Sequence, residues 1–232
     1  MEEVLPTRRL QGNRALVLVV LMVFSLGLGL GCASAGPTPV AFPSAHPVVF
    51  DAEDGATAFQ LAPNGESISL RNGKKAVLAS VRESGGRLAI EDASGEVAWF
   101  IERRPGASLR LRVIEAKNGA TAFVIKSDSD GDVKVENGEK KRMAVAKRRD
   151  YGFKLVDPGG KLIARIRSRS GKTSVRDAAG TTYLTTRDAI PAEAVALLVF
   201  ERFPIEVAAG LGVATAFWPA PMEGAAETRS AE

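Results

Sequence analysis

The segment Asp54-Gly-Ala-Thr-Ala-Phe59 recurs almost unchanged as Asn118-Gly-Ala-Thr-Ala-Phe123, at an offset of 64 residues. After one inserted residue the offset becomes 65, and Asn72-Gly73 then falls on Asn137-Gly138. An identical five-residue string in register with later turn residues indicates an internal duplication, and such a repeat decides the fold.

The duplication predicts two copies of one structural unit, at residues 48–104 and 112–169. Each copy consists of short runs of alternating apolar and polar residues, separated by Asn-Gly, Asp-Gly and other glycine-containing turns. Such turns supply the positive φ that tight hairpins require, so we expect antiparallel strands. The fold class is therefore mainly β, with about twelve strands that close into a barrel or, alternatively, pack as a sandwich.

The C-terminal segment 191–218 has a different pattern. Pro191-Ala-Glu193 is typical of a helix start, and residues 194–200 and 207–218 are almost uniformly apolar on either side of Glu201–Pro204. A helix without a polar face is buried, and a barrel of about twelve strands is too wide for its own side chains to fill. We therefore predict a hydrophobic helix at the centre of the barrel. The alternative is a membrane-associated helix outside it.

About twelve antiparallel strands followed by an apolar C-terminal helix resemble the tubby C-terminal-like superfamily, which includes tubby proteins, LURP-one-related proteins and phospholipid scramblases. The resemblance covers residues 48–218 and depends on strand count, duplication and the final helix. It implies a barrel around a hydrophobic helix in a protein that engages or moves membrane phospholipids. The sequence has no match to the phosphoinositide-binding residues of tubby or to the scramblase calcium segment, so neither activity is carried over.

Residues 1–31 resemble a bacterial lipoprotein signal peptide. Three arginines precede an uncharged apolar run, residues 15–30, which is shorter than a membrane-spanning helix. The run ends in Leu-Gly-Leu-Gly-Cys32, which resembles a lipobox with a bulky leucine before the final glycine. This resemblance implies a lipid anchor on Cys32, and Ala33 after it favours the outer membrane. The alternatives are a secretory signal cut near Ala33–Ala35 and an uncleaved membrane anchor.

The predicted mature chain has three parts. Residues 32–47 form a tether that is rich in proline and alanine, residues 48–218 form a single β domain, and residues 219–232 form a disordered tail. The domain would face either the periplasm or the cell surface.

The composition restricts the chemistry. The net charge of +4 is mildly basic, and the chain has one cysteine, Cys32, and one histidine, His46, neither of them in the domain. No nucleophile elbow or phosphate-binding glycine loop is present. We therefore expect no enzymatic activity, no cofactor or metal site and no nucleic-acid partner.

A cluster of basic residues is the candidate ligand site. It consists of Lys140, Lys141, Arg142, Lys147, Arg148 and Arg149. On one or two strands, these residues would contact the phosphate groups of anionic phospholipid or lipopolysaccharide. The alternative is a solvated strand whose charges discourage edge pairing. Arg165, Arg167 and Arg169 alternate, so we expect them on the outer face of one barrel strand.

The segment Asp128-Ser-Asp130-Gly-Asp132 resembles the opening of a calcium-binding loop. Its glycine is misplaced for such a loop, and the segment aligns with the turn at Asn64-Gly65 in the first copy. We therefore expect a plain hairpin turn here.

The leading functional hypothesis is a membrane-anchored envelope lipoprotein that binds phospholipid or another envelope component. A structural or assembly protein that binds protein partners through sheet edges or its C-terminal tail is the alternative. A hydrolase of unfamiliar type is the third hypothesis, and nothing in the sequence singles out its residues.

Overall fold

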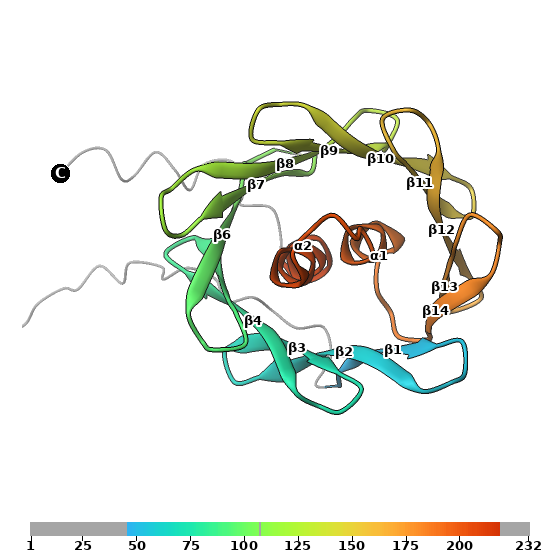
Figure 1. Cartoon of the computed structure of the whole chain (residues 1–232), viewed down its shortest axis with the longest axis horizontal. Helices are drawn as coiled ribbons and strands as arrows, with labels where there is room; N and C mark the ends of the chain where they lie inside the picture. The colour runs from blue at the N-terminus through green and yellow to red at the C-terminus, as the bar shows by residue number, and fades with distance from the viewer. Residues whose placement is uncertain (1–45, 107, 219–232) are drawn as a thin grey trace, which may run out of the picture. The chain divides into compact units, whose positions relative to one another are not determined.

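Fourteen antiparallel strands form a closed barrel in the computed structural model, which describes residues 46–106 and 108–218 (Figure 1). Each strand pairs with its neighbours in the sequence, and β14 pairs with β1. The strands are β1 Val48–Ala52, β2 Thr57–Asn64, β3 Ser67–Asn72, β4 Val77–Ser84, β5 Arg87–Glu91, β6 Val97–Arg103, β7 Arg110–Glu115, β8 Thr121–Ser127, β9 Val133–Asn137, β10 Arg142–Arg149, β11 Gly152–Val156, β12 Leu162–Arg169, β13 Lys172–Arg176 and β14 Thr182–Thr186. Two helices, α1 Ala192–Leu198 and α2 Ile205–Phe217, lie inside the barrel.

The predictions for the two ends of the chain lie outside the described residues. They concern the signal peptide 1–31, Cys32, the tether up to residue 45 and the tail 219–232. Within the described part of the chain, no helix is both long and apolar enough to cross a bilayer.

The predicted fold class is confirmed, because the protein is mainly β with a C-terminal helical segment inside a barrel (Figure 1). Closure between β1 and β14 excludes the sandwich alternative. The strand number is fourteen rather than about twelve. Strands β13 and β14 continue the barrel beyond the second copy and correspond to two further alternating runs of the sequence, 173–176 and 181–185. The predicted segment 191–218 forms two helices, and the break between them falls at Glu201–Pro204, where the sequence interrupts the apolar pattern. Pro204 has no N–H to donate to a preceding turn, and the chain reverses before α2 begins.

Turns at one end of the barrel, which we call rim A, follow every second strand. They begin at Ala52, Asn72, Asp92, Glu115, Asn137, Asp157 and Asp177, at intervals of 20 to 23 residues. In the five that begin with Asn or Asp, the side-chain oxygen accepts a backbone N–H from within the turn. Three successive hairpins of this kind occupy about 65 residues, which explains the offset between the two copies. The opposite end, rim B, holds the start of β1 and the end of β14.

Glycines show how closely the two copies correspond. A Cβ on Gly73 would lie 2.1 Å from the carbonyl oxygen of Thr57, and a Cβ on Gly138 would lie 2.0 Å from that of Thr121. The turn lysines that follow, Lys75 and Lys140, have φ values of 64° and 63°. The corresponding turns therefore have the same backbone path, in which the glycine allows two strands to approach closely.

The helices fill the interior of the barrel. α2 packs against β4, β5 and β6, and α1 packs against β11 and β12, so the pair connects the two copies. A Cβ on Gly210 would lie 2.3 Å from Cδ1 of Ile90, and one on Gly212 would lie 2.5 Å from Cγ of Leu198. Both glycines are thus needed for close packing, one against the wall and one between the helices.

The closure of the barrel depends on a short seam between β1 and β14. Only two residue pairs are in register there, Asp51 with Thr185 and Ala52 with Leu184. The backbone N–H of Val49 also donates to the carboxylate of Asp188 at 2.6 Å, which extends the seam beyond the end of β14. The first and last strands are therefore joined over a shorter length than the neighbouring pair β1–β2, which has four residue pairs in register.

Candidate anion-binding surface

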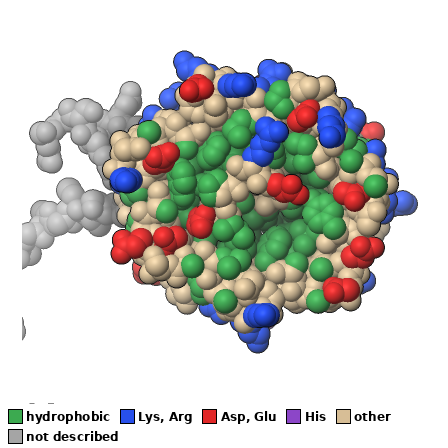
Figure 2. Space-filling model, in the orientation of Figure 1, with side chains coloured by type: hydrophobic (Ala, Val, Ile, Leu, Met, Phe, Trp, Pro, Cys, Tyr) green, Lys and Arg blue, Asp and Glu red, His purple; other side chains and the backbone are tan. Residues whose placement is uncertain are grey.

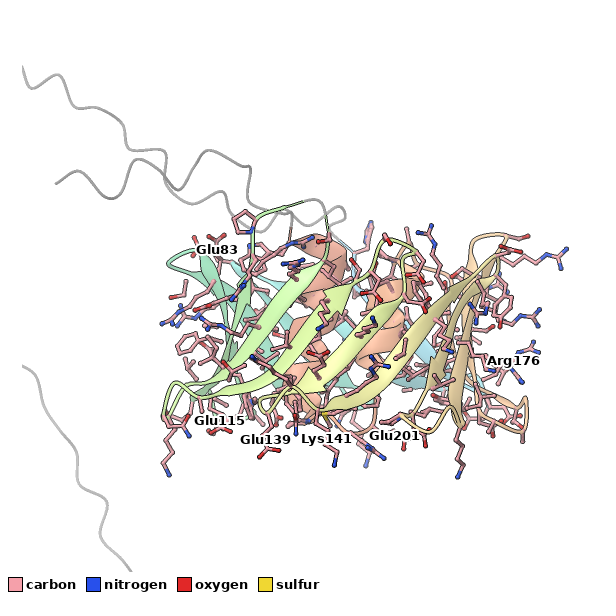
Figure 3. The ribbon with its side chains drawn as sticks, turned by 90° about the horizontal axis from the view of Figure 1, so that it is seen from above. Glu83, Glu115, Glu139, Lys141, Arg176 and Glu201 are labelled. Carbon is pink, nitrogen blue, oxygen red and sulfur yellow. The ribbon has the colours of Figure 1, made fainter. Side chains whose placement is uncertain are left out.

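The six basic residues predicted as a cluster do not lie together. Lys140 and Lys141 lie in the β9–β10 turn at rim A, where Figure 3 shows Lys141 beside Glu139. Arg149 lies at the far end of β10, roughly 23 Å from its start at 3.3 Å per residue. Strand β10 therefore divides the predicted cluster between the two rims.

Alternation along β10 also divides the cluster between two faces. Lys147 faces outward and lies directly opposite Lys154 on the neighbouring strand β11. Arg148 follows it on the inner side of rim B, where its charge acts on Glu193 of α1. Arg165 and Arg167 lie on the outer face of β12 as expected, since their neighbours Ala164 and Ile166 are buried inside.

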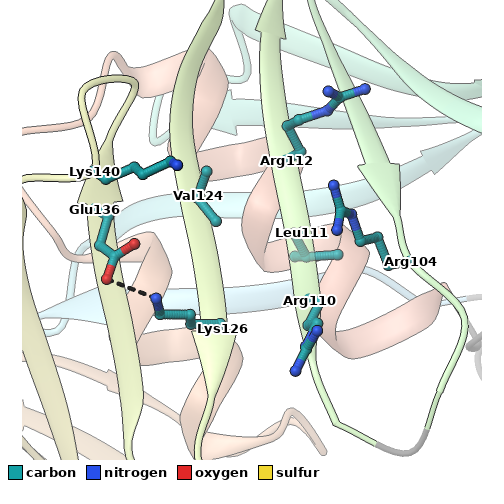
Figure 4. Close-up of a pocket in the computed structure, with 8 residues that line it drawn as sticks. All are labelled: Arg104, Arg110, Leu111, Arg112, Val124, Lys126, Glu136 and Lys140. Atoms are coloured by element: carbon teal, nitrogen blue, oxygen red, sulfur yellow. Dashed lines mark ion pairs between the residues drawn. The ribbon is translucent and has the colours of Figure 1, made fainter.

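A groove on the outer wall over β7, β8 and β9 brings together basic residues from distant parts of the sequence (Figure 4). It has a volume of about 530 Å³. It is lined by Arg104, Arg110, Leu111, Arg112, Val124, Lys126, Glu136 and Lys140. Of the six residues predicted as a cluster, Lys140 alone lines the groove.

Acidic side chains neutralise part of this groove. The ammonium group of Lys126 lies 2.8 Å from the carboxylate of Glu136, as Figure 4 shows, and Arg112 pairs with Glu102 on β6. Arg104, Arg110 and Lys140 make no ion pair within the described residues. The groove therefore has an excess of positive charge around the apolar side chain of Val124.

Apart from Lys140, the groove residues do not stand out in the sequence because they come from four different segments. Arg110 is visible in the sequence only as a polar member of the alternating run Leu109–Val113, and Arg104 follows the end of β6. Which residues of β7, β8 and β9 become neighbours depends on strand register, for example Arg110 opposite Lys126. A pattern within one strand does not contain that information.

The segment Asp128–Asp132 forms the hairpin turn expected from its alignment with the first copy. Gly131 has a φ of +81°, and its N–H donates to the carbonyl of Asp128 at 3.0 Å. The Asp128 carboxylate pairs with Lys134, and the Asp132 carboxylate accepts the backbone N–H of Arg148 at 2.7 Å. The carboxylates therefore stabilise the protein's own turn, and the described residues contain no group of three or more candidate metal ligands.

Charged groups on the inner side of rim B hold the helices in place. The guanidinium of Arg103 on β6 donates to the carbonyl of Ala214 at 3.1 Å and to that of Trp218, at the C-terminal end of α2. Burial raises the pKa of the Glu193 carboxyl, and the charges of Arg103 and Arg148 oppose that rise. Burial also raises the pKa of Glu83, which lies at the rim opposite Glu115, Glu139 and Glu201 (Figure 3). We assign Arg103 a structural role, because it caps the C-terminal end of α2.

Comparison with known proteins gives little guidance. No family model matches the chain, and no curated protein matches it. Among solved structures, the crystal structure of BamB from Moraxella catarrhalis is similar, with 12% sequence identity over 55% of this chain and 69% of that chain and a TM-score of 0.27. A likeness at this TM-score supports neither a shared fold nor a shared function. The resemblance to the tubby-like superfamily stays a prediction.

Proposed function

We propose that this protein is an exported, lipid-anchored envelope protein whose barrel binds anionic envelope components without catalysing a reaction. Cys32, at the end of the lipobox-like segment, is the proposed anchor, and the outer membrane is the proposed location. The position of the helices supports binding at the outer surface, because α1 and α2 occupy the barrel interior (Figure 1). On that surface, the groove over β7–β9 offers unpaired positive charge.

The groove suits a phosphate group that carries an apolar substituent. The guanidinium groups of Arg104 and Arg110 offer paired donors that match phosphate oxygens, and Lys140 adds a third positive charge. Val124 between them offers an apolar contact for the substituent. Phospholipid headgroups and lipopolysaccharide both present this chemistry.

The groove is tested by replacing its unpaired arginines. We expect the full chain in detergent to bind a short-chain phosphatidic acid. Arg110→Gln should weaken this binding by about ten- to a hundredfold, since a hydrogen bond to a charged group contributes roughly 1.5–3 kcal/mol. Isothermal titration calorimetry measures the effect. Arg87→Gln is the matched control, because Arg87 lies 3.6 Å from the ring of Phe100 on β6, outside the groove. Equal affinities of the Arg110 and Arg87 variants would contradict the assignment.

The anchor is tested at Cys32, the only thiol in the chain. We expect Cys32→Ser to abolish incorporation of a clickable fatty acid in cells, since the variant lacks the acceptor sulfur. Labelling is measured by in-gel fluorescence, and Ala33→Ser is a control that keeps the thiol. If Cys32→Ser incorporates as much fatty acid as the natural chain, the lipid anchor is ruled out.

A protein-binding role is the second candidate, and the surface of rim A favours it. Figure 2 views this end and shows apolar side chains around a few charged ones inside the rim. Three large apolar residues keep more than a third of their surface exposed to solvent: Val77 at 39%, Tyr183 at 37% and Ile205 at 48%. Partner binding through a free sheet edge, as the sequence allowed, is excluded for the barrel because β1 and β14 close it.

A further inference from the structure

Four consecutive strands, β10 to β13, carry positive charge without any negative charge. They contain ten lysine and arginine residues, four on β10, one on β11, three on β12 and two on β13, and no aspartate or glutamate. Lys147, Lys154, Arg165 and Arg176 lie directly opposite one another across these strands. We call these four residues the basic row and the outer face of β10–β13 the basic wall.

The basic row is electrostatically unfavourable in the isolated protein. Like charges directly opposite one another on adjacent strands destabilise a sheet. None of the four residues makes an ion pair with a described residue, and each side chain is half-buried. Arg176 points away from the barrel in Figure 3, and its Nε has no hydrogen-bond partner within the described part of the chain. Bound anions would relieve this repulsion.

The first copy shows that the fold does not require such a wall. On their outer faces, strands β5 and β6 carry Glu91 and Glu102, whose counterparts in the second copy are Val156 and Arg167. On the first copy's outer face, Arg82 pairs with Glu91 at 2.7 Å, and Glu102 pairs with Arg112. Both copies form equivalent strands, so folding does not require the outer face of the second copy to lack acidic residues. The absence of aspartate and glutamate from strands β10–β13 therefore points to a binding role for this face.

We infer that the basic wall docks against an anionic phospholipid bilayer, so that the barrel lies on its side on the membrane. The outer surface of a barrel is convex, so a row of cations on it reaches a plane of phosphates better than it encloses a small ligand (Figure 1). Lysine and arginine side chains near an anionic membrane surface are attracted to its phosphate groups. The ring of Tyr151 lies 5.2 Å from the guanidinium carbon of Arg167 and places an aromatic side chain beside the wall, as is common at membrane interfaces. This inference depends on the proposed function only for a tether that keeps the barrel near the membrane.

Lysine footprinting of the full chain in vesicles tests the docking. The chain is reconstituted into phosphatidylcholine vesicles with or without phosphatidylglycerol, and acetylation of each lysine is followed by mass spectrometry. We expect Lys147 and Lys154 to react several-fold more slowly when phosphatidylglycerol is present. Lys74 and Lys75, in the β3–β4 turn, should react equally in both lipids. Salt at about 1 M should abolish the protection, since the Debye length is then roughly 3 Å.

Two variants with the same net charge separate the wall from overall charge. Arg165→Gln with Arg176→Gln is expected to abolish the protection of Lys147 and Lys154, whereas Arg82→Gln with Arg87→Gln should preserve it. Circular dichroism confirms that both variants are folded. The inference would be overturned if Lys147 and Lys154 reacted equally fast in the two lipids. It would also be overturned if Lys74 and Lys75 were protected by phosphatidylglycerol as strongly as Lys147 and Lys154. Vesicle flotation measures separately whether the chain stays attached to the vesicles. A chain that floats without protection of Lys147 and Lys154 is anchored but does not dock through the basic wall.

Discussion

A chain that ends after Ile190 is expected to lose cooperative folding. The interior of the barrel is occupied by α1 and α2, and their buried side chains include Val195, Leu197, Val207 and Leu211. Without them, the apolar inner faces of fourteen strands would surround water, and the hydrophobic stabilisation of the whole core would be lost. Thermal melting followed by circular dichroism, together with binding of a hydrophobic dye, measures the outcome.

A single substitution tests the same feature without shortening the chain. Leu197→Asp would place a charge where the side chain is 2% exposed, and we expect a loss of about 3–5 kcal/mol of unfolding free energy. Ile205→Asp is the matched control at the start of α2, where the side chain is 48% exposed, and its effect should be small. A soluble chain ending at Ile190 with a sharp melting transition would contradict the central role of the helices.

Alanine at either of two corresponding turn glycines is expected to destabilise the barrel strongly. The new Cβ would lie 2.1 Å from the Thr57 carbonyl oxygen in Gly73→Ala and 2.0 Å from the Thr121 carbonyl oxygen in Gly138→Ala. Both oxygens belong to the backbone, so a strand has to move. We expect each variant to lose about 3 kcal/mol of unfolding free energy. Urea denaturation with an unchanged m-value measures this loss.

Gly159→Ala is the control for these two variants. It lies in a turn of the same rim, but the nearest atom to its Cβ is Oδ1 of Asp157 at 3.4 Å, which is ordinary contact. Its expected effect is below about 1 kcal/mol. A large effect at Gly138 with none at Gly73 would show that the two copies differ in backbone path.

Turn chemistry made much of the fold predictable. Asn72-Gly73 and Asn137-Gly138 mark the positions of hairpins, and the duplication multiplies that signal. The positive φ that was expected at these glycines is found instead at Lys75 and Lys140. Strands β13 and β14 follow the second copy, and the alternating runs 173–176 and 181–185, separated by Ala179-Gly180, mark them in the sequence. Apolar residues on every side of α2 predicted its burial correctly, since such a helix has no face for water.

The candidate site was less predictable for a physical reason. The six residues of the sequence cluster lie on strand β10 and the turn before it, and a strand separates its residues by length and by alternate faces. The basic row instead joins four residues from four strands, Lys147, Lys154, Arg165 and Arg176. Their alignment depends on the register between strands, which the pattern within one strand does not contain.

The short seam between β1 and β14 has a consequence for the order of folding. Apart from this seam, every strand pairs with its sequence neighbour, so the hairpins can form early as the chain lengthens. The seam joins residues more than 130 apart, and β14 ends only six residues before α1 begins. The helices are synthesised last, yet they end up enclosed. We therefore expect zipping of β1 to β14 to be the late, rate-limiting step, completed only once α1 and α2 have entered the open sheet.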